Sequence, residues 1–269
     1  MAGPVRGLAL FGLLLLLPGA APAHDTWLLP RSVTSQPGQQ IVLDLTSGMR
    51  FPALESAIQP DRIARAAIRC NAKDAEIRDR KAAKSALALS TEVPESGIAA
   101  IWVETRPKDI ELKPEQVKEY LEEIGAWDTV GRVWERSGSK RWREVYTKHS
   151  KTFVRIGDPG DDRSWGEPVG MDLEIVPEKD PTTLAVGDDL SVRVLLDGRP
   201  LPDLSVGFAP AEHKSGATRK TDAAGRASVR VDRAGWWLIK GTLVTASARS
   251  GADWESHFTT LTLKVGNPR

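Results

Sequence analysis

Two side chains near the C-terminus have the types and spacing of metal ligands. Glu255 and His257 are separated by one residue, and on an extended strand residues at i and i+2 leave the same face. A carboxylate and an imidazole side by side can bind one transition-metal ion. The same face continues through Leu261 and Leu263, so the alternative interpretation is a histidine that caps the end of the hydrophobic core.

A third potential ligand, His24, follows a segment that resembles a cleavable export signal. Arg6 precedes an apolar run at 8–17, and the sequence APA at 21–23 has the small-residue pattern of a cleavage site. The apolar run is too short to anchor the chain in a bilayer. Cleavage after residue 23 would make His24 the first residue, whose amine and Nδ1 could together chelate nickel, cobalt or copper. Cleavage a few residues earlier would abolish that chelate.

Two further histidines have neighbours that give weaker support for metal binding. His213 follows Glu212 in a predicted loop, where adjacent side chains can converge on one ion, and a solvated loop is the alternative. His149 lies between Lys148 and Lys151, and neighbouring cations disfavour a bound metal ion. His149 is therefore ranked last among the possible ligands.

The motifs of familiar catalysts are missing. The sequence contains no H-E-x-x-H, no paired C-x-x-C, no G-x-S-x-G and no Walker loop. Its one cysteine, Cys70, alternates with Ile68, which predicts a buried and unreactive thiol. The 37 Lys and Arg residues nearly balance the 36 Asp and Glu residues, so no global field attracts nucleic acid. We predict a protein that is not an enzyme and does not bind nucleic acid.

The elements that must position these ligands are predicted to be mainly β. In the first half, strands are predicted at 24–30, 40–45, 98–104 and 143–156. A helix is predicted at 114–124, because proline lies in its first turn and Gly125 follows its last apolar position. A second helix is predicted from about 127 to 135. Two segments fit either a helix or a strand, 61–70 and 84–90.

From residue 171 onward, short alternating runs are separated by turn signals. These runs lie at 172–176, 190–196, 203–209, 226–231, 236–244 and 258–265. Such regular short strands predict an immunoglobulin-like β-sandwich. The predicted organisation is a signal peptide at 1–23, an N-terminal β-rich domain with one or two helices at 24–170, and the sandwich domain at 171–269.

Several segments spread along the chain together resemble one known family. They are HDTWLLP at 24–30, REVYTKHSKTFVRIGD at 143–158, LEIVPEKDP at 173–181, VGDDLSVRVLLDGRPLPDLSV at 186–206, TDAAGRASVRVDRAGWWLI at 221–239 and DWESHFTTLTLKV at 253–265. They resemble the bacterial periplasmic proteins of the DUF4198 family, which is similar to periplasmic components associated with nickel and cobalt uptake systems.

The resemblance implies a β-rich domain joined to an immunoglobulin-like domain, and a role in binding or delivering a divalent metal. The initial histidine and the W-E-S element of the family match His24, Trp254 and Glu255. His257 departs from the family pattern, because relatives often carry an aromatic residue after W-E-S.

Three functions are compatible with these observations. The first is a periplasmic protein that binds Ni²⁺, Co²⁺ or Cu²⁺ and works with a membrane metal transporter; its predicted ligands are His24, Glu255, His257 and His213. The second is a non-catalytic immunoglobulin-like envelope module that binds protein or polysaccharide. The third is a copper oxidase that uses the N-terminal histidine. We expect the first, in a chain without a membrane anchor after cleavage.

Overall fold

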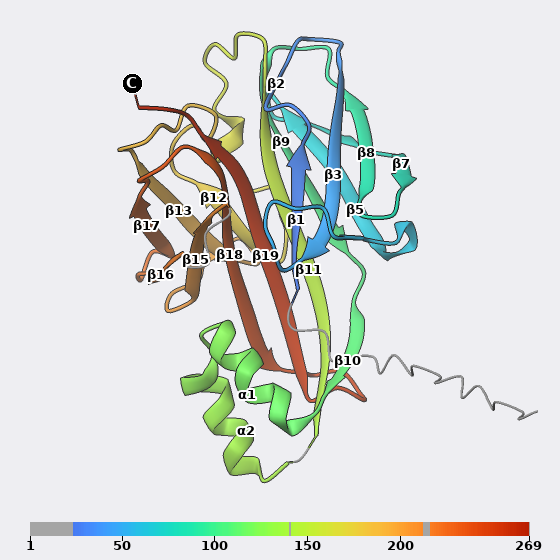
Figure 1. Ribbon diagram of the computed structural model, residues 1–269, viewed down its shortest axis with the longest axis vertical. Coiled ribbons are helices and arrows are strands. Elements are labelled where there is room, and N and C mark those ends of the chain that lie inside the picture. The colour runs from blue at the N-terminus through green and yellow to red at the C-terminus, as the bar shows by residue number, and fades with distance from the viewer. Residues whose placement is uncertain (1–23, 140, 212–215, 269) are drawn as a thin grey trace, which may run out of the picture.

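The computed structural model describes residues 24–139, 141–211 and 216–268, and most of them lie in β-strands. Figure 1 shows long strands through the middle of the molecule and two short helices at one end. The mainly β fold predicted from the sequence is therefore confirmed. The two segments that fitted either a helix or a strand both form strands, β5 (Ile63–Cys70) and β8 (Leu87–Glu92).

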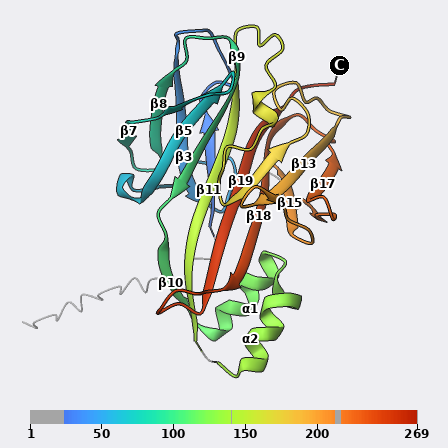
Figure 2. The ribbon, with the colours of Figure 1, turned by 180° about the vertical axis from the view of Figure 1, so that it is seen from behind.

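A ten-stranded sheet forms the centre of the described structure. Besides β5, its strands are β2 (Thr34–Ser35), β6 (Lys73–Glu76), β9 (Gly97–Thr105), β10 (Lys108–Leu112), β11 (Trp142–Ile156), β15 (Ser205–Pro210), β16 (Ala217–Lys220), β18 (Gly235–Ala246) and β19 (Trp254–Val265). The strand order is β16-β15-β18-β19-β11-β9-β5-β6, and β2 and β10 also pair with β11. Long β11 and β19 lie side by side in this order, as Figure 2 shows from behind.

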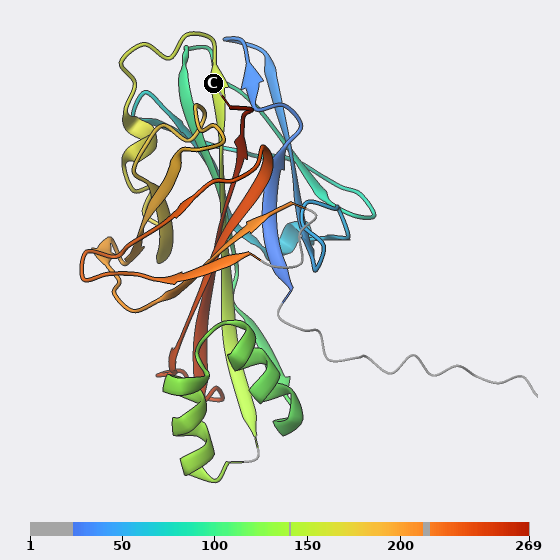
Figure 3. The same ribbon diagram turned by 60° about the vertical axis from the view of Figure 1, so that its left-hand side comes forward.

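Two smaller sheets cover the two faces of this central sheet. The first contains β8 with β1 (Asp25–Pro30), β3 (Gln40–Gly48), β4 (Ser56–Ala57) and β7 (Asp79–Ala82). The second contains β12 (Leu173–Pro177), β13 (Asp189–Leu196), β14 (Arg199–Pro200) and β17 (Arg226–Arg230). Figure 3 shows these two sheets on opposite sides of β11 and β19.

Alternation along the central strands explains why both faces are covered. In β9, Ile98 and Ala100 belong to the core under the β12–β13 sheet, while Ala99 and Ile101 belong to the core under the β3–β8 sheet. Successive side chains of a strand point to opposite faces, so a strand that is apolar throughout needs a cover on each side. The near-continuous apolar run of β9 thus requires the three-layer arrangement.

The central sheet joins the two halves of the sequence. Strands β15, β16, β18 and β19 come from the predicted sandwich domain, whereas β5, β9 and β11 come from the predicted N-terminal domain. The junction is the parallel pair β11–β19, in which Thr147 lies opposite His257. The second small sheet packs on the C-terminal strands and also over β9 and β11 of the central sheet, so both halves of the sequence contribute to this two-layer sandwich.

The helices close one end of the central sheet. They are α1 (Pro114–Glu123), a π-helical turn (Trp127–Gly131) and α2 (Arg132–Ser137), and 3₁₀ turns lie at Pro60–Arg62 and Ser164–Gly166. Apolar residues of α1 and α2 form a small core with Trp142 and Val244 of the sheet. The helix predicted at 114–124 is confirmed. Among the described residues, no helix has the length and apolar character needed to cross a bilayer.

Cys70 ends β5 and is buried, as its pattern predicts. Burial, reinforced by the negative charge of Asp162, raises the pKa of its thiol to about 11. Since the thiolate is the reactive form of cysteine, the protonated thiol of Cys70 is inert near neutral pH.

Candidate metal centre

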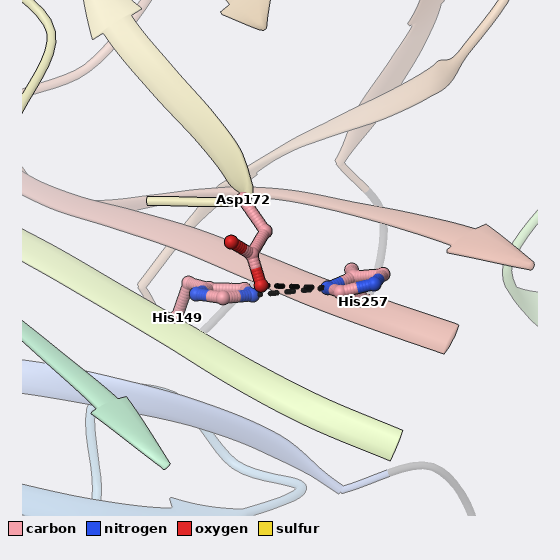
Figure 4. Close-up of side chains that lie close together, drawn as sticks. All are labelled: His149, Asp172 and His257. Carbon is pink, nitrogen blue, oxygen red and sulfur yellow. Dashed lines mark hydrogen bonds and ion pairs between the residues drawn. The ribbon is translucent and has the colours of Figure 1, made fainter. Parts of the chain in front are cut away.

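Two histidines from distant parts of the sequence meet on one face of the central sheet. The β11–β19 register places Thr147 opposite His257 and His149 opposite Thr259, so the two histidines are diagonal neighbours on the same face. Nε2 of His149 lies 3.3 Å from Nδ1 of His257, and the rings are nearly parallel at an interplanar angle of 14°. Figure 4 shows the two rings with these nitrogens facing each other.

A carboxylate from the covering sheet completes the cluster. Asp172 directly precedes β12, and its Oδ2 lies 3.8 Å from Nδ1 of His257. One ligand atom from each of Asp172, His149 and His257 lies within 4.8 Å of the other two. No other group of three such side chains converges in this way within 24–139, 141–211 and 216–268.

The spacing of these atoms suits a transition-metal ion. Nitrogen and oxygen ligands lie about 2.0–2.2 Å from Zn²⁺, which places neighbouring ligands of a tetrahedral site about 3.3–3.6 Å apart. The two histidine nitrogens already have that separation, and the carboxylate oxygen is slightly further away. The histidine contact is also the length of a hydrogen bond, so one ring can donate to the other when no ion is bound.

The cluster is closed on one side and open on the other. The side chain of His149 is 0% exposed and that of His257 is 17% exposed, whereas the side chain of Asp172 is 56% exposed. An ion would therefore reach the histidines past Asp172, and solvent could supply a further ligand there.

The electrostatics favour a neutral ring at His257. Burial lowers the pKa of His257, and proximity to His149 lowers it further, whereas Asp172, Glu255 and Asp197 oppose this shift. A neutral imidazole keeps the lone pair that a metal ion requires. The three acids meanwhile make the surroundings attractive to a cation.

The other ring nitrogen of His149 faces a carboxylate. Nδ1 of His149 is buried without a hydrogen-bond partner among the described residues, and Oε2 of Glu104 lies 3.7 Å from it. Histidines that ligate metals usually donate their other N–H to a carboxylate, which fixes the ring and its tautomer. Glu104 is placed to orient His149 with Nε2 directed at the ion.

A buried ion pair holds the covering strand in place beside the cluster. Lys151 lies two residues after His149 on β11, and Glu174 lies two residues after Asp172. Nζ of Lys151 lies 2.6 Å from Oε1 of Glu174, and both side chains are only 1% exposed. This ion pair holds β12 against β11, two residues beyond the cluster on each strand. It therefore keeps Asp172 in position over the two histidines.

The structure brings one of the four predicted ligands into the cluster. His257 is a member, but the carboxylate of its strand neighbour Glu255 lies 3.1 Å from Arg249 and outside the converging group. His24 also lies outside it: its backbone carbonyl accepts a hydrogen bond from Lys148, which points to the opposite face of β11 from His149. His213 lies outside the described residues.

His149 and Asp172 are the ligands that the sequence did not single out. The cations around His149 were the reason for ranking it last, but Lys148 leaves the other face of the strand and Lys151 is neutralised by Glu174. The alternation of β11 contains enough information to show that Lys148 and His149 diverge. No local pattern marks Asp172, because its partners are distant in the sequence.

Comparisons with known proteins identify a family without a described activity. No curated protein matches the chain. Among solved structures, the Yersinia pseudotuberculosis adhesin InvE is similar at 12% identity and a TM-score of 0.23, over 88% of this chain and 58% of that one. Escherichia coli alpha-2-macroglobulin activated by porcine elastase is similar at 9% identity and a TM-score of 0.27, over 89% of this chain and 20% of that one.

This chain thus spans less than two thirds of either solved structure, and at such TM-scores we infer nothing from them. The family "Domain of unknown function (DUF4198)" matches residues 21–245, which is most of the sequence. The chain therefore belongs to the DUF4198 family.

Proposed function

We propose that this protein is an exported, non-catalytic carrier of a divalent transition-metal ion, which His149, Asp172 and His257 hold. The observation that carries the proposal is the convergence of their three ligand atoms within 4.8 Å of one another. Two imidazoles with one carboxylate suit borderline ions such as Ni²⁺, Co²⁺ and Cu²⁺ better than Mg²⁺ or Ca²⁺, which prefer oxygen ligands.

The open side of the cluster supports a carrier rather than a structural ion. Structural zinc sites are closed by four protein ligands, whereas sites that exchange a ligand keep one position open. Here three protein ligands converge, and the most exposed of them is Asp172. An ion in this place can be loaded and released without unfolding the protein.

The location and the partner are inferred from sequence. The export-like segment at 1–23 lies outside the described residues, and it supports export of the chain to the periplasm. A membrane transporter for nickel or cobalt is the partner that the DUF4198 resemblance suggests. Transfer of the ion to such a transporter would use the same open side of the cluster.

Metal titration tests this function directly. Protein stripped with EDTA is titrated calorimetrically with Ni²⁺, Co²⁺, Cu²⁺ and Zn²⁺, and anaerobically with Fe²⁺, because two histidines and one carboxylate also suit ferrous iron. We expect saturable binding of one transition-metal ion per chain, a raised melting temperature, and no comparable binding of Mg²⁺. If none of these transition-metal ions binds at a one-to-one ratio, the proposal is wrong.

Substitution of Glu104 tests the orientation of His149. Glu104→Gln should weaken binding of the preferred ion by about 10- to 100-fold, the usual cost of losing the carboxylate behind a ligating histidine. Glu95→Gln is the matched control, because Glu95 pairs with Lys73 at the surface. Equal affinities of the two variants in calorimetric titration would show that Glu104 does not orient the ligand.

A further inference from the structure

A cavity of about 550 Å³ lies on the opposite face of β11 and β19 from the metal cluster. Tyr146 and Lys148 of β11 and Phe258 of β19 line it, together with residues of β10, α1 and the segment before β5. Tyr146 and Lys148 alternate with Thr147 and His149, so the strand separates this cavity from the cluster. Its volume lies within the range of about 300–1,000 Å³ that small-molecule sites occupy.

The ammonium of Lys148 is held in this wall without an acidic partner. Its Nζ donates hydrogen bonds to the backbone carbonyl of His24 at 2.5 Å and to Oγ1 of Thr26 at 3.1 Å. It lies 5.7 Å from the ring centre of Tyr146 and 5.6 Å from that of Phe258. Both hydrogen-bond acceptors are neutral, and an ammonium has three N–H donors, so one N–H remains free to contact an anion. Burial lowers the pKa of Lys148 to about 8, and the negative charge of Asp25 offsets part of that shift.

A second cation stands beside Lys148. The guanidinium of Arg62 lies 5.5 Å from the ring centre of Tyr146 and donates to the backbone carbonyl of Pro107. In the part of the chain that the structure describes, neither Lys148 nor Arg62 has a carboxylate within ion-pair distance. Two cations converging on aromatic rings without a counter-charge make a wall that favours an anion, because buried charges are normally paired.

Three acidic residues line the cavity, Glu119, Glu123 and Glu144, and within the described residues none of them forms an ion pair with Lys148 or Arg62. Glu144 directs its oxygens at other donors: Oε1 accepts hydrogen bonds from Tyr120 and Ser256, and Oε2 accepts one from Trp142. Glu123 is exposed and lies 4.0 Å from Lys240. No carboxylate of the described residues forms an ion pair with Lys148, so its ammonium can accept one from a ligand carboxylate.

We propose that this cavity is a second binding site, for a small organic anion whose carboxylate contacts Lys148 and Arg62 and whose aromatic or apolar body lies against Tyr146 and Phe258. Cation–π contacts already hold the ammonium over the rings, so the ligand finds its polar partner and its apolar surface side by side. The site does not depend on the proposed metal function, because the two sites use opposite faces of the sheet.

The anionic dye 8-anilinonaphthalene-1-sulfonate is the probe for this site, used on the full exported chain in the presence of EDTA. We expect saturable fluorescence enhancement at one dye per chain and displacement of the dye by phenylacetate. Phenethylamine, which has a similar body and the opposite charge, should require at least tenfold higher concentrations to displace it. Equal displacement by the two compounds would overturn the proposal.

Substitutions locate the probe in the cavity. Lys148→Met should weaken both the dye and phenylacetate at least tenfold, and Lys148→Arg should retain most of the affinity. Arg62→Gln, at a partly exposed position, should weaken phenylacetate severalfold without a folding defect. The matched control is Lys264→Met, since Lys264 also lies over a ring, that of Trp236, but on an exposed surface. Unchanged phenylacetate affinity in folded Lys148→Met and Arg62→Gln proteins would contradict the site.

Discussion

Replacing His257 with alanine is expected to weaken binding of Ni²⁺ or Co²⁺ by at least about 100-fold. Removing a residue that only orients a metal ligand lowers the metal affinity about 10- to 100-fold. The His257 substitution removes a ligand itself, so its effect should be at least as large as the upper end of that range. A 100-fold loss corresponds to about 2.7 kcal/mol of binding free energy. Calorimetric titration measures the change, and the melting temperature of the variant should no longer rise when the ion is added.

His24→Ala is the informative control for that experiment. His24 lies outside the converging group, so its replacement should leave the affinity within about twofold if the cluster is the site. The melting temperature of the metal-free His257→Ala protein shows whether the fold is intact. Loss of binding in His24→Ala with retention in His257→Ala would move the ion to His24 and refute the cluster as the site.

Replacing Lys151 with methionine is expected to destabilise the protein by about 3–5 kcal/mol, the usual cost of removing one partner of a buried ion pair. The carboxylate of Glu174 would remain buried, with backbone N–H groups of Val169, Gly170 and Met171 as its hydrogen-bond donors. Denaturant unfolding of the metal-free protein measures this change. Because the pair also fixes β12 on β11, the affinity for the ion should fall in the same variant.

A double variant separates the ion pair from simple loss of packing. Lys151→Met combined with Glu174→Gln removes both charges, so it should be clearly less destabilised than the sum of the two single variants. Arg226→Met, which breaks the exposed pair with Glu178, should have a much smaller effect than Lys151→Met. If the two single substitutions are additive, the ion pair is not what holds these strands together.

Much of the fold could be predicted from local patterns. The proline and glycine at the ends of α1 define that helix. In β17, Ala227 and Val229 are buried and Ser228 is exposed, and this alternation defines a strand with one solvent-exposed face. The segment that became β5 remained ambiguous because its alanine and arginine content favours a helix. Pairing with β9 on one side and β6 on the other decides its state, and such tertiary pairing has no local signature.

The candidate site was harder to predict than the fold. The spacing of Glu255 and His257 predicted the strand and face on which His257 joins the cluster, but the partners of His257 come from β11 and from the segment before β12. A parallel pairing between strands so far apart in sequence cannot be inferred from periodicity. The charge of Lys148 also misled the interpretation of His149, because charge along a strand must be assigned to faces before it is added up.

The parallel pairing of β11 with β19 also sets the order of events during biogenesis. The two histidines are 108 positions apart in the sequence, and contacts of such long range form slowly because a large loop must close first. Until β19 has been synthesised and has paired with β11, the two histidines cannot lie together. If the chain carries an ion as proposed, capture follows the pairing of β11 with β19, and the ion comes from the compartment in which the chain folds.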